Sequence, residues 1–202
     1  MKGSIIVVSF FALGVLLANF GLVPKGVVAA SSDAGYYVLC ALMFSVGVSI
    51  GCDSKVLGSL RSIDLRLMLL PLATILGSLG GVAFASAFFP GLRIADGLAV
   101  GAGLGYYSLS SIFITEYRGA ELGTVALLSN ILRELVALLF APLLARLFGK
   151  LAPISAGGAT TMDTTLPIIT TVSGREFVTV SVFHGFVTDF SVPFLVTFFC
   201  SL

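Results

Sequence analysis

Charged residues are scarce in this sequence. Lys and Arg number 11 and Asp and Glu number 10 among 202 residues, which is 10% of the chain, whereas a soluble globular domain carries about 25% charged residues. A soluble fold of this length needs a polar outer shell that so few charged side chains can hardly supply. The composition therefore excludes water as the main solvent of the chain.

Residues that bind metals or nucleic acids are also scarce. The chain has one His and three Cys, namely Cys40, Cys52 and Cys200, and no Cys-x-x-Cys or Cys/His spacing joins them. The cysteines are interpreted as small buried hydrophobic residues, and neither a metal site nor a cofactor is predicted. The net charge of +1 includes neither a basic block nor an acidic tail, so no nucleic acid partner is expected.

Apolar residues are abundant instead. They make up 57% of the chain, and the mean hydropathy is +1.11. Because a membrane helix needs about 20 mostly apolar residues, about seven segments qualify as membrane crossings. They predict an all-α, multi-pass integral membrane protein with one transport domain over residues 1–202, surrounded by the lipid bilayer. The segments are Ser4–Val23, Tyr36–Cys52, Leu65–Phe89, Gly97–Tyr117, Gly123–Phe148, Ala152–Thr171 and Phe177–Cys200.

The segment Ala156–Pro167 (AGGATTMDTTLP) interrupts this apolar pattern. Gly157 and Gly158 weaken helix formation, and Pro167 cannot donate a backbone hydrogen bond. The threonines can satisfy the exposed backbone groups locally. The segment therefore predicts a discontinuous helix, which membranes tolerate only where protein or a water-filled cavity surrounds the backbone.

Asp163 lies inside this predicted break, between Thr161 and Thr164. A carboxylate at membrane depth costs about 2.5 to 3.5 kcal/mol on insertion scales, so it usually marks an ion path or a specific partner. We interpret Asp163 as a substrate- or proton-binding residue, with the two threonines beside it. A fixed, hydrogen-bonded brace is the alternative.

A second break is predicted in Gly101–Ser111 (GAGLGYYSLSS). Its three glycines alternate with other residues and are followed by two tyrosines and three serines. Tyr107 and Ser110 are candidates for orienting a polar solute. Hydrogen bonds to neighbouring helices and close helix packing through small residues explain the same pattern, so both interpretations stay open.

Asn130, Arg133 and Glu134 form a third polar group in an apolar segment. Residues three and four positions apart lie near one face of a helix, so the three side chains can gather there. Glu116 and Asp163 are candidate partners for Arg133. The group is interpreted either as part of the binding site, with Glu134 relaying protons, or as a structural ion-pair network.

His184 and Asp189 are secondary candidates in the last segment. Their separation of five residues places them on different helix faces, so they are not expected to form one dyad. A neutral histidine held by hydrogen bonds is the commoner case, although histidine can also carry protons.

Four ordered motifs resemble the lysine exporter family. The resemblance extends over about Val38 to Leu202, and no motif in it is typical of a membrane-embedded enzyme. The motifs are Tyr107–Ser110 (YSLS) followed by Thr115–Glu116 (TE), Arg133–Glu134 (RE), Gly158–Asp163 (GATTMD) with Leu166–Pro167 (LP), and His184–Phe186 (HGF).

The resemblance implies a bacterial inner-membrane exporter of L-lysine or a similar small cationic amino acid. Longer members of the family carry an N-terminal hydrophobic block that this chain lacks, which implies a homo-oligomer or a second membrane subunit. Some members have an acidic residue where this chain has Asn130. More distantly, the paired breaks are similar to those of cation/proton antiporters, in which two crossed breaks form the binding site.

The resulting hypothesis is proton-coupled exchange at Asp163. Desolvation favours the protonated form of a carboxylic acid, while an approaching ammonium favours the ionised form. The lysine carboxylate would meet backbone N–H groups, assisted by Tyr107, Ser110 or Arg133. A sodium- or proton-coupled carrier of another solute and a non-transporting subunit of a split transporter are the alternatives.

Overall fold

The computed structural model of the chain describes residues 13–14, 16–24, 37, 44, 48, 65–89 and 91–202. The predicted span Tyr36–Cys52 lies almost entirely outside these residues, as do Cys40 and Cys52. Within the described part, every element of regular structure is a helix, in agreement with the all-α prediction.

The described helices follow the predicted segments from Leu65 onward. Two short 3₁₀ helices, η1 and η2, also occur, at Gly158–Met162 and Arg175–Phe177. The α-helices are α4 (Leu65–Met68), α5 (Leu70–Ser86), α6 (Ile94–Gly101), α7 (Tyr107–Arg118), α8 (Ala120–Phe148), α9 (Ala152–Gly157), α10 (Leu166–Ser173) and α11 (Val178–Ser201).

The two longest helices pass straight through polar residues. Helix α8 runs for 29 residues and includes Arg133 and Glu134 without a break. Helix α11 runs for 24 residues through His184, Asp189 and Pro193. Helical structure is interrupted elsewhere, between α6 and α7 and between α9 and α10. These are the two places where the sequence predicts breaks.

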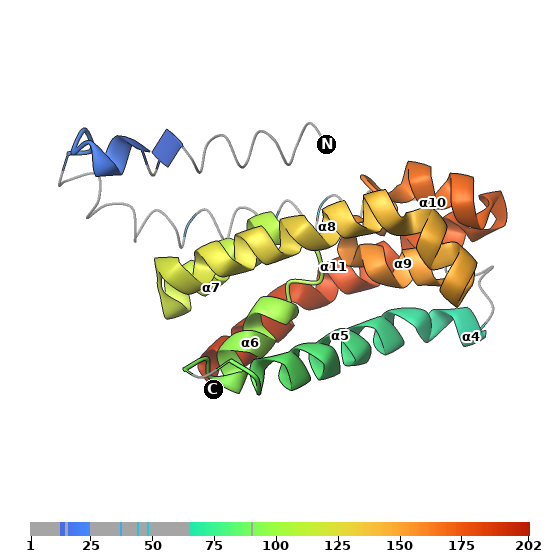
Figure 1. Cartoon of the computed structure of the whole chain (residues 1–202), viewed down its shortest axis with the longest axis horizontal. Coiled ribbons are helices and arrows are strands. Elements are labelled where there is room, and N and C mark those ends of the chain that lie inside the picture. Colours follow the sequence, from blue (N-terminus) through green and yellow to red (C-terminus); the bar gives the residue numbers. More distant parts are fainter. Residues whose placement is uncertain are drawn as a thin grey trace.

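Helices α5 and α8 lie along opposite sides of the bundle (Figure 1). Between them lie α6 and α9, the two helices that lead into the interruptions, and each of these contacts both α5 and α8. After a turn at Gly119, whose φ is 92°, the first half of α8 runs back along α7. The two interruptions are therefore held inside the bundle.

Two hydrophobic cores flank the interruptions. The larger core joins α6, α7, α8 and α11 and contains Leu104, Leu109 and Ile114, each at most 1% exposed. The smaller joins α9, α10 and α11 through Ile154, Ile169 and Val180. Packing on both sides fixes the position of the interruptions between them.

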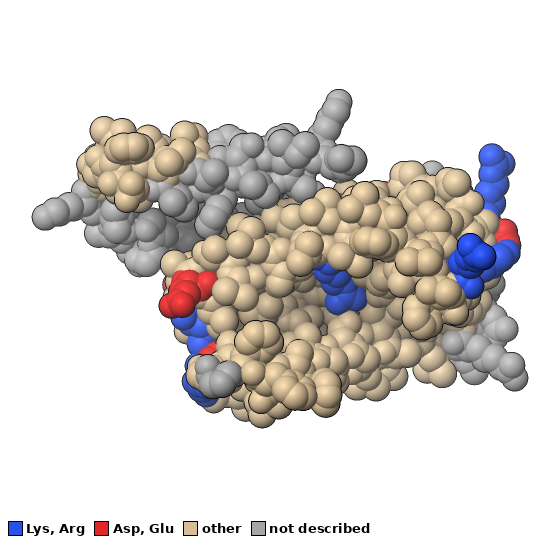
Figure 2. All heavy atoms as spheres, in the orientation of Figure 1, with Lys and Arg blue, Asp and Glu red and all other residues tan. Residues whose placement is uncertain are grey.

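The outer surface is strongly apolar. Large side chains are exposed on α5, α8 and α11, for example Phe84 (71%), Leu139 (72%) and Phe194 (59%). A monomeric soluble protein rarely exposes apolar patches on this scale. Figure 2 shows charged groups gathered at the two ends of the bundle, with basic atoms midway between them.

One described helical stretch is long and apolar enough to cross a membrane by length and composition. It covers Arg175–Ser201, which is 27 residues, and the shorter helix Leu70–Ser86 is also apolar.

Candidate functional site

The interruption between α6 and α7 is stabilised by Asn130. Leu104 and Gly105 adopt positive φ angles of 48° and 96°. The Asn130 side chain accepts a hydrogen bond from the Gly105 N–H at 2.8 Å and donates to the carbonyls of Ala126 at 2.9 Å and Val100 at 3.3 Å. Asn130 is 3% exposed, so it supports the backbone where the helix hydrogen bonds are missing.

The interruption between α9 and α10 begins at Gly158. Its φ of 62° and ψ of −128° belong to a region that residues with a Cβ rarely adopt. Within η1, the Thr160 and Thr161 hydroxyls donate to the carbonyls of Gly157 and Gly158 at 2.9 and 2.8 Å. Thr165 donates to the Thr160 carbonyl at 3.0 Å. The predicted role of threonine in satisfying this backbone is confirmed.

The two interruptions touch each other through their backbones. The Ala159 N–H donates to the Leu104 carbonyl at 2.9 Å. A Cβ on Gly158 would lie 2.1 Å from that carbonyl oxygen, and a Cβ on Gly105 would lie 3.1 Å from the Gly157 oxygen. We call this contact of Leu104 and Gly105 with Gly158 and Ala159 the crossing. Only glycine permits such a close approach of two backbones.

Asp163 follows η1 and is exposed. Its carboxylate accepts a hydrogen bond from the Thr164 N–H. Asp189 of α11 interacts electrostatically with Asp163. Tyr106, which follows Gly105 of the crossing, interacts electrostatically with both carboxylates. Asp189 is 6% exposed, and no hydrogen bond to its carboxylate is found within the described ranges. A carboxylate that a solute can reach thus lies beside a second, buried one.

His184 forms a buried hydrogen-bonded chain with two threonines. It is 0% exposed, its Nε2 lies 2.9 Å from the Thr74 hydroxyl, and its Nδ1 lies 3.2 Å from the Thr161 hydroxyl. The Thr161 hydroxyl also lies 2.8 and 2.9 Å from the carbonyls of Gly158 and Ser181. Its one proton goes to a carbonyl, so His184 donates from Nδ1, and in the neutral ring Nε2 then accepts from the Thr74 hydroxyl. This assigns a neutral histidine that joins α5, α11 and η1.

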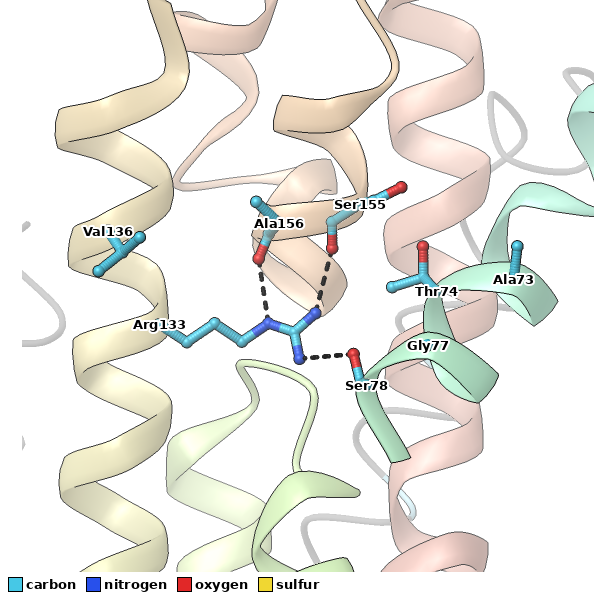
Figure 3. Close-up of a pocket in the computed structure, with 8 residues that line it drawn as sticks. All are labelled: Ala73, Thr74, Gly77, Ser78, Arg133, Val136, Ser155 and Ala156. Atoms are coloured by element: carbon cyan, nitrogen blue, oxygen red, sulfur yellow. Dashed lines mark hydrogen bonds between the residues drawn. The ribbon is translucent and has the colours of Figure 1, made fainter. Parts of the chain in front are cut away.

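Arg133 holds the end of α9. Its Nε and Nη2 donate to the carbonyls of Ala156 at 3.0 Å and Ser155 at 3.1 Å, and its Nη1 donates to the Ser78 hydroxyl at 3.1 Å (Figure 3). The expected partners Glu116 and Asp163 are therefore wrong. The last carbonyls of a helix have no partner within it and attract a cation, and this sequence-independent attraction decides where the guanidinium lies.

The other predicted residues lie on α7 and α8. Glu134 is buried at 2% exposure on α8, whereas Glu116 is exposed on α7. The Ser110 hydroxyl is fully buried and donates to the Tyr106 carbonyl at 2.7 Å, so it serves the local helix. Tyr107 begins α7. Tyr106 was not among the residues predicted to form the site. Its position directly after the glycines of the break is the sequence feature that indicates it.

We expect Asn130→Leu to lower the free energy of unfolding by about 3 kcal/mol, because buried polar groups left without partners cost about 1 to 3 kcal/mol each. The variant leaves the Gly105 N–H and the Val100 carbonyl without the bonds that Asn130 makes. Thermal unfolding in detergent measures the change. Thr124→Val is the control, because the Thr124 hydroxyl bonds only to the Ala120 carbonyl of its own helix. Equal stability of the two variants would show that Asn130 does not support the break.

An apolar helical bundle in which two interrupted helices meet beside a reachable carboxylate is typical of membrane transport proteins. The chain belongs to the lysine exporter family, because the profile described as "Lysine exporter LysO" matches residues 8–200. The resemblance seen in the sequence motifs is thereby confirmed.

Two relatives agree with this assignment. A protein of Escherichia coli K12 described as "Lysine exporter LysO" is 32% identical over 188 residues, which is 92% of this chain and 62% of that protein. A Haemophilus influenzae protein, provisionally described as a lysine exporter, is 35% identical over 170 residues, which is 84% of this chain and 86% of that protein. The chain thus spans about three fifths of the length of the E. coli relative. No solved structure matches the chain significantly.

Proposed function

We propose that the chain is a secondary transporter that exports L-lysine, or a similar cationic amino acid, across the bacterial cytoplasmic membrane. The observation that carries the proposal is the position of Asp163, which is exposed and directly follows η1, the 3₁₀ helix that begins at the crossing. The family supports the substrate class. In membrane transporters, ion and substrate sites usually consist of a discontinuous helix with a carboxylate beside the interruption.

Exchange at this site follows from competition for one carboxylate. Asp163 holds a proton when no cation is near and releases it when the lysine ammonium approaches, since the two positive charges exclude each other. The buried Asp189 of α11 interacts electrostatically with Asp163, so it is the second carboxylate of this site. The coupling ion in this scheme is H⁺, and Na⁺ is the alternative.

The bundle in this proposal crosses the membrane about seven times, with α6–α7 and α9–α10 as the two discontinuous helices. Their crossing resembles the arrangement expected of a cation/proton antiporter. In this proposal the chain works with a membrane partner, which is a second copy of the chain or another membrane subunit.

Transport assays with purified chain in liposomes test this function. The liposomes are loaded with labelled L-lysine, and a pH gradient is imposed across their membrane. We expect lysine efflux that stops when the gradient is dissipated and that excess unlabelled lysine or ornithine inhibits. Efflux that follows a Na⁺ gradient instead would assign the coupling to sodium. Absence of lysine efflux, both for the chain alone and with a co-purified membrane subunit, would contradict the proposal.

A further inference from the structure

Among the described residues, no acidic side chain forms an ion pair with Arg133. The ion pairs within the part of the chain that the structure describes join Arg118 to Asp96 and Lys150 to Glu176. Arg133 instead contacts two carbonyls and one hydroxyl. A guanidinium away from bulk water calls for an anion nearby, because neutral dipoles compensate the lost hydration only in part.

The guanidinium also has donors to spare. It has five N–H groups, and three of them bind Ala156, Ser155 and Ser78, so two have no partner among the described residues, one on Nη1 and one on Nη2. The Ala156 and Ser155 bonds use Nε and Nη2 and fix the plane of the group. An arginine held in this way can donate its remaining N–H groups to the oxygens of a carboxylate.

Arg133 lines two adjoining pockets. The larger has a volume of about 500 Å³ and lies between α5, α8 and α9, where Thr74, Ser78 and Ser155 supply polar groups (Figure 3). The smaller, of about 310 Å³, shares Gly77, Ser78 and Arg133 with it. Glycine and alanine on α5 leave this space open, and pockets of such size accommodate small organic ligands.

The pocket and Asp163 lie at opposite ends of η1. A Cβ on Gly158, the first residue of η1, would lie 3.3 Å from the Arg133 guanidinium, and Asp163 directly follows the last residue, Met162. At a rise of about 2 Å per residue, the backbones of Gly158 and Asp163 lie about 10 Å apart along η1. A solute with an anionic and a cationic end matches this arrangement of charges.

We propose that the Arg133 pocket binds the α-carboxylate of the amino-acid substrate, through the two remaining guanidinium N–H groups. The inference rests on the proposed function and adds the residue that distinguishes an amino acid from a simple diamine. Cadaverine, which is lysine without the carboxylate, lacks the group that this pocket binds. Lysinamide replaces the carboxylate with a neutral amide and keeps both amines.

Calorimetric binding of L-lysine and L-lysinamide to the full chain in neutral-lipid nanodiscs tests this site. We expect wild type to bind lysine about 10- to 100-fold more tightly than lysinamide, because hydrogen bonds to charged groups contribute about 1.5 to 3 kcal/mol. In Arg133→Gln, lysine binding should fall to the lysinamide level, while lysinamide binding stays unchanged. Arg146→Gln is the matched control, because Arg146 lies exposed in the last turn of the same helix.

The remaining outcomes separate the two proposals. Equal affinity of wild type for lysine and lysinamide overturns the carboxylate site but leaves lysine transport standing, and this contrast does not depend on whether Arg133→Gln folds. Absence of binding of either ligand by wild type overturns both proposals.

A lipid phosphate is the other source of an anion for this pocket. If anionic phosphatidylglycerol in the nanodiscs abolishes the preference for lysine, the pocket is a lipid site and the proposal fails.

Discussion

Asp163→Asn is expected to abolish lysine flux in liposomes while leaving the protein folded. Asparagine has the size of aspartate and can still accept a hydrogen bond from the Thr164 N–H, the contact that the Asp163 carboxylate makes. It cannot take up or release a proton, and it lacks the charge that attracts an ammonium. We expect flux to fall by about 100-fold or more, since loss of an ionic contact of about 3 kcal/mol corresponds to that factor.

The control for this experiment is Glu121→Gln, which makes the same carboxylate-to-amide change at an exposed residue in the first turn of α8. Its flux should equal that of wild type at equal protein content. Thermal unfolding of Asp163→Asn shows whether a loss of flux comes from the missing carboxylate or from an unfolded protein. Unchanged lysine flux in Asp163→Asn would remove this residue from the mechanism and shift the exchange site to another carboxylate, with Asp189 as the next candidate.

Gly158→Ala is expected to destroy both folding and transport. The added Cβ would lie 2.1 Å from the Leu104 carbonyl oxygen, and the backbone at Gly158 has a φ of 62°. The clash involves two backbones that hydrophobic cores hold on either side, so neither moves easily. We expect a loss of more than about 3 kcal/mol in stability from the strained conformation and the clash together.

Gly80→Ala is the matched control, because Gly80 lies within α5 and a Cβ there meets nothing within 4 Å. Alanine favours a helix over glycine by about 0.5 to 1 kcal/mol, so this variant should be at least as stable as wild type. Thermal unfolding and size-exclusion chromatography in detergent measure both variants. A folded, active Gly158→Ala protein would mean that the two interruptions do not approach each other as closely as the structure shows.

The sequence predicts both interruptions correctly because their causes are local. Gly157 and Gly158 weaken a helix and Pro167 suits the first turn of a new one, and the alternating glycines at 101–105 weaken a helix in the same way. Hydropathy also places the long helix α8, although it gives its start three residues late. The membrane crossings themselves remain a prediction, as do the functional roles of the individual site residues.

The contacts of the site could not be predicted because the groups involved carry no sequence signal. Arg133 binds backbone carbonyls, which every residue possesses, and so a search for acidic partners failed. Leu104 adopts a positive φ of 48° that glycine would normally supply. Tyr106 and Tyr107 are adjacent and chemically identical, and only the local backbone brings Tyr106 close to Asp163.

The crossing is joined by a hydrogen bond between two main chains, from the Ala159 N–H to the Leu104 carbonyl. Such a bond joins main-chain groups, and it requires Gly158 at the contact and Asn130 to support the backbone of Gly105. Mutational drift can therefore alter Ser78, Tyr106 and other neighbours of the site without dismantling the scaffold. A family built on this arrangement can acquire new substrates through single substitutions, and directed evolution of substrate range should begin with these neighbours.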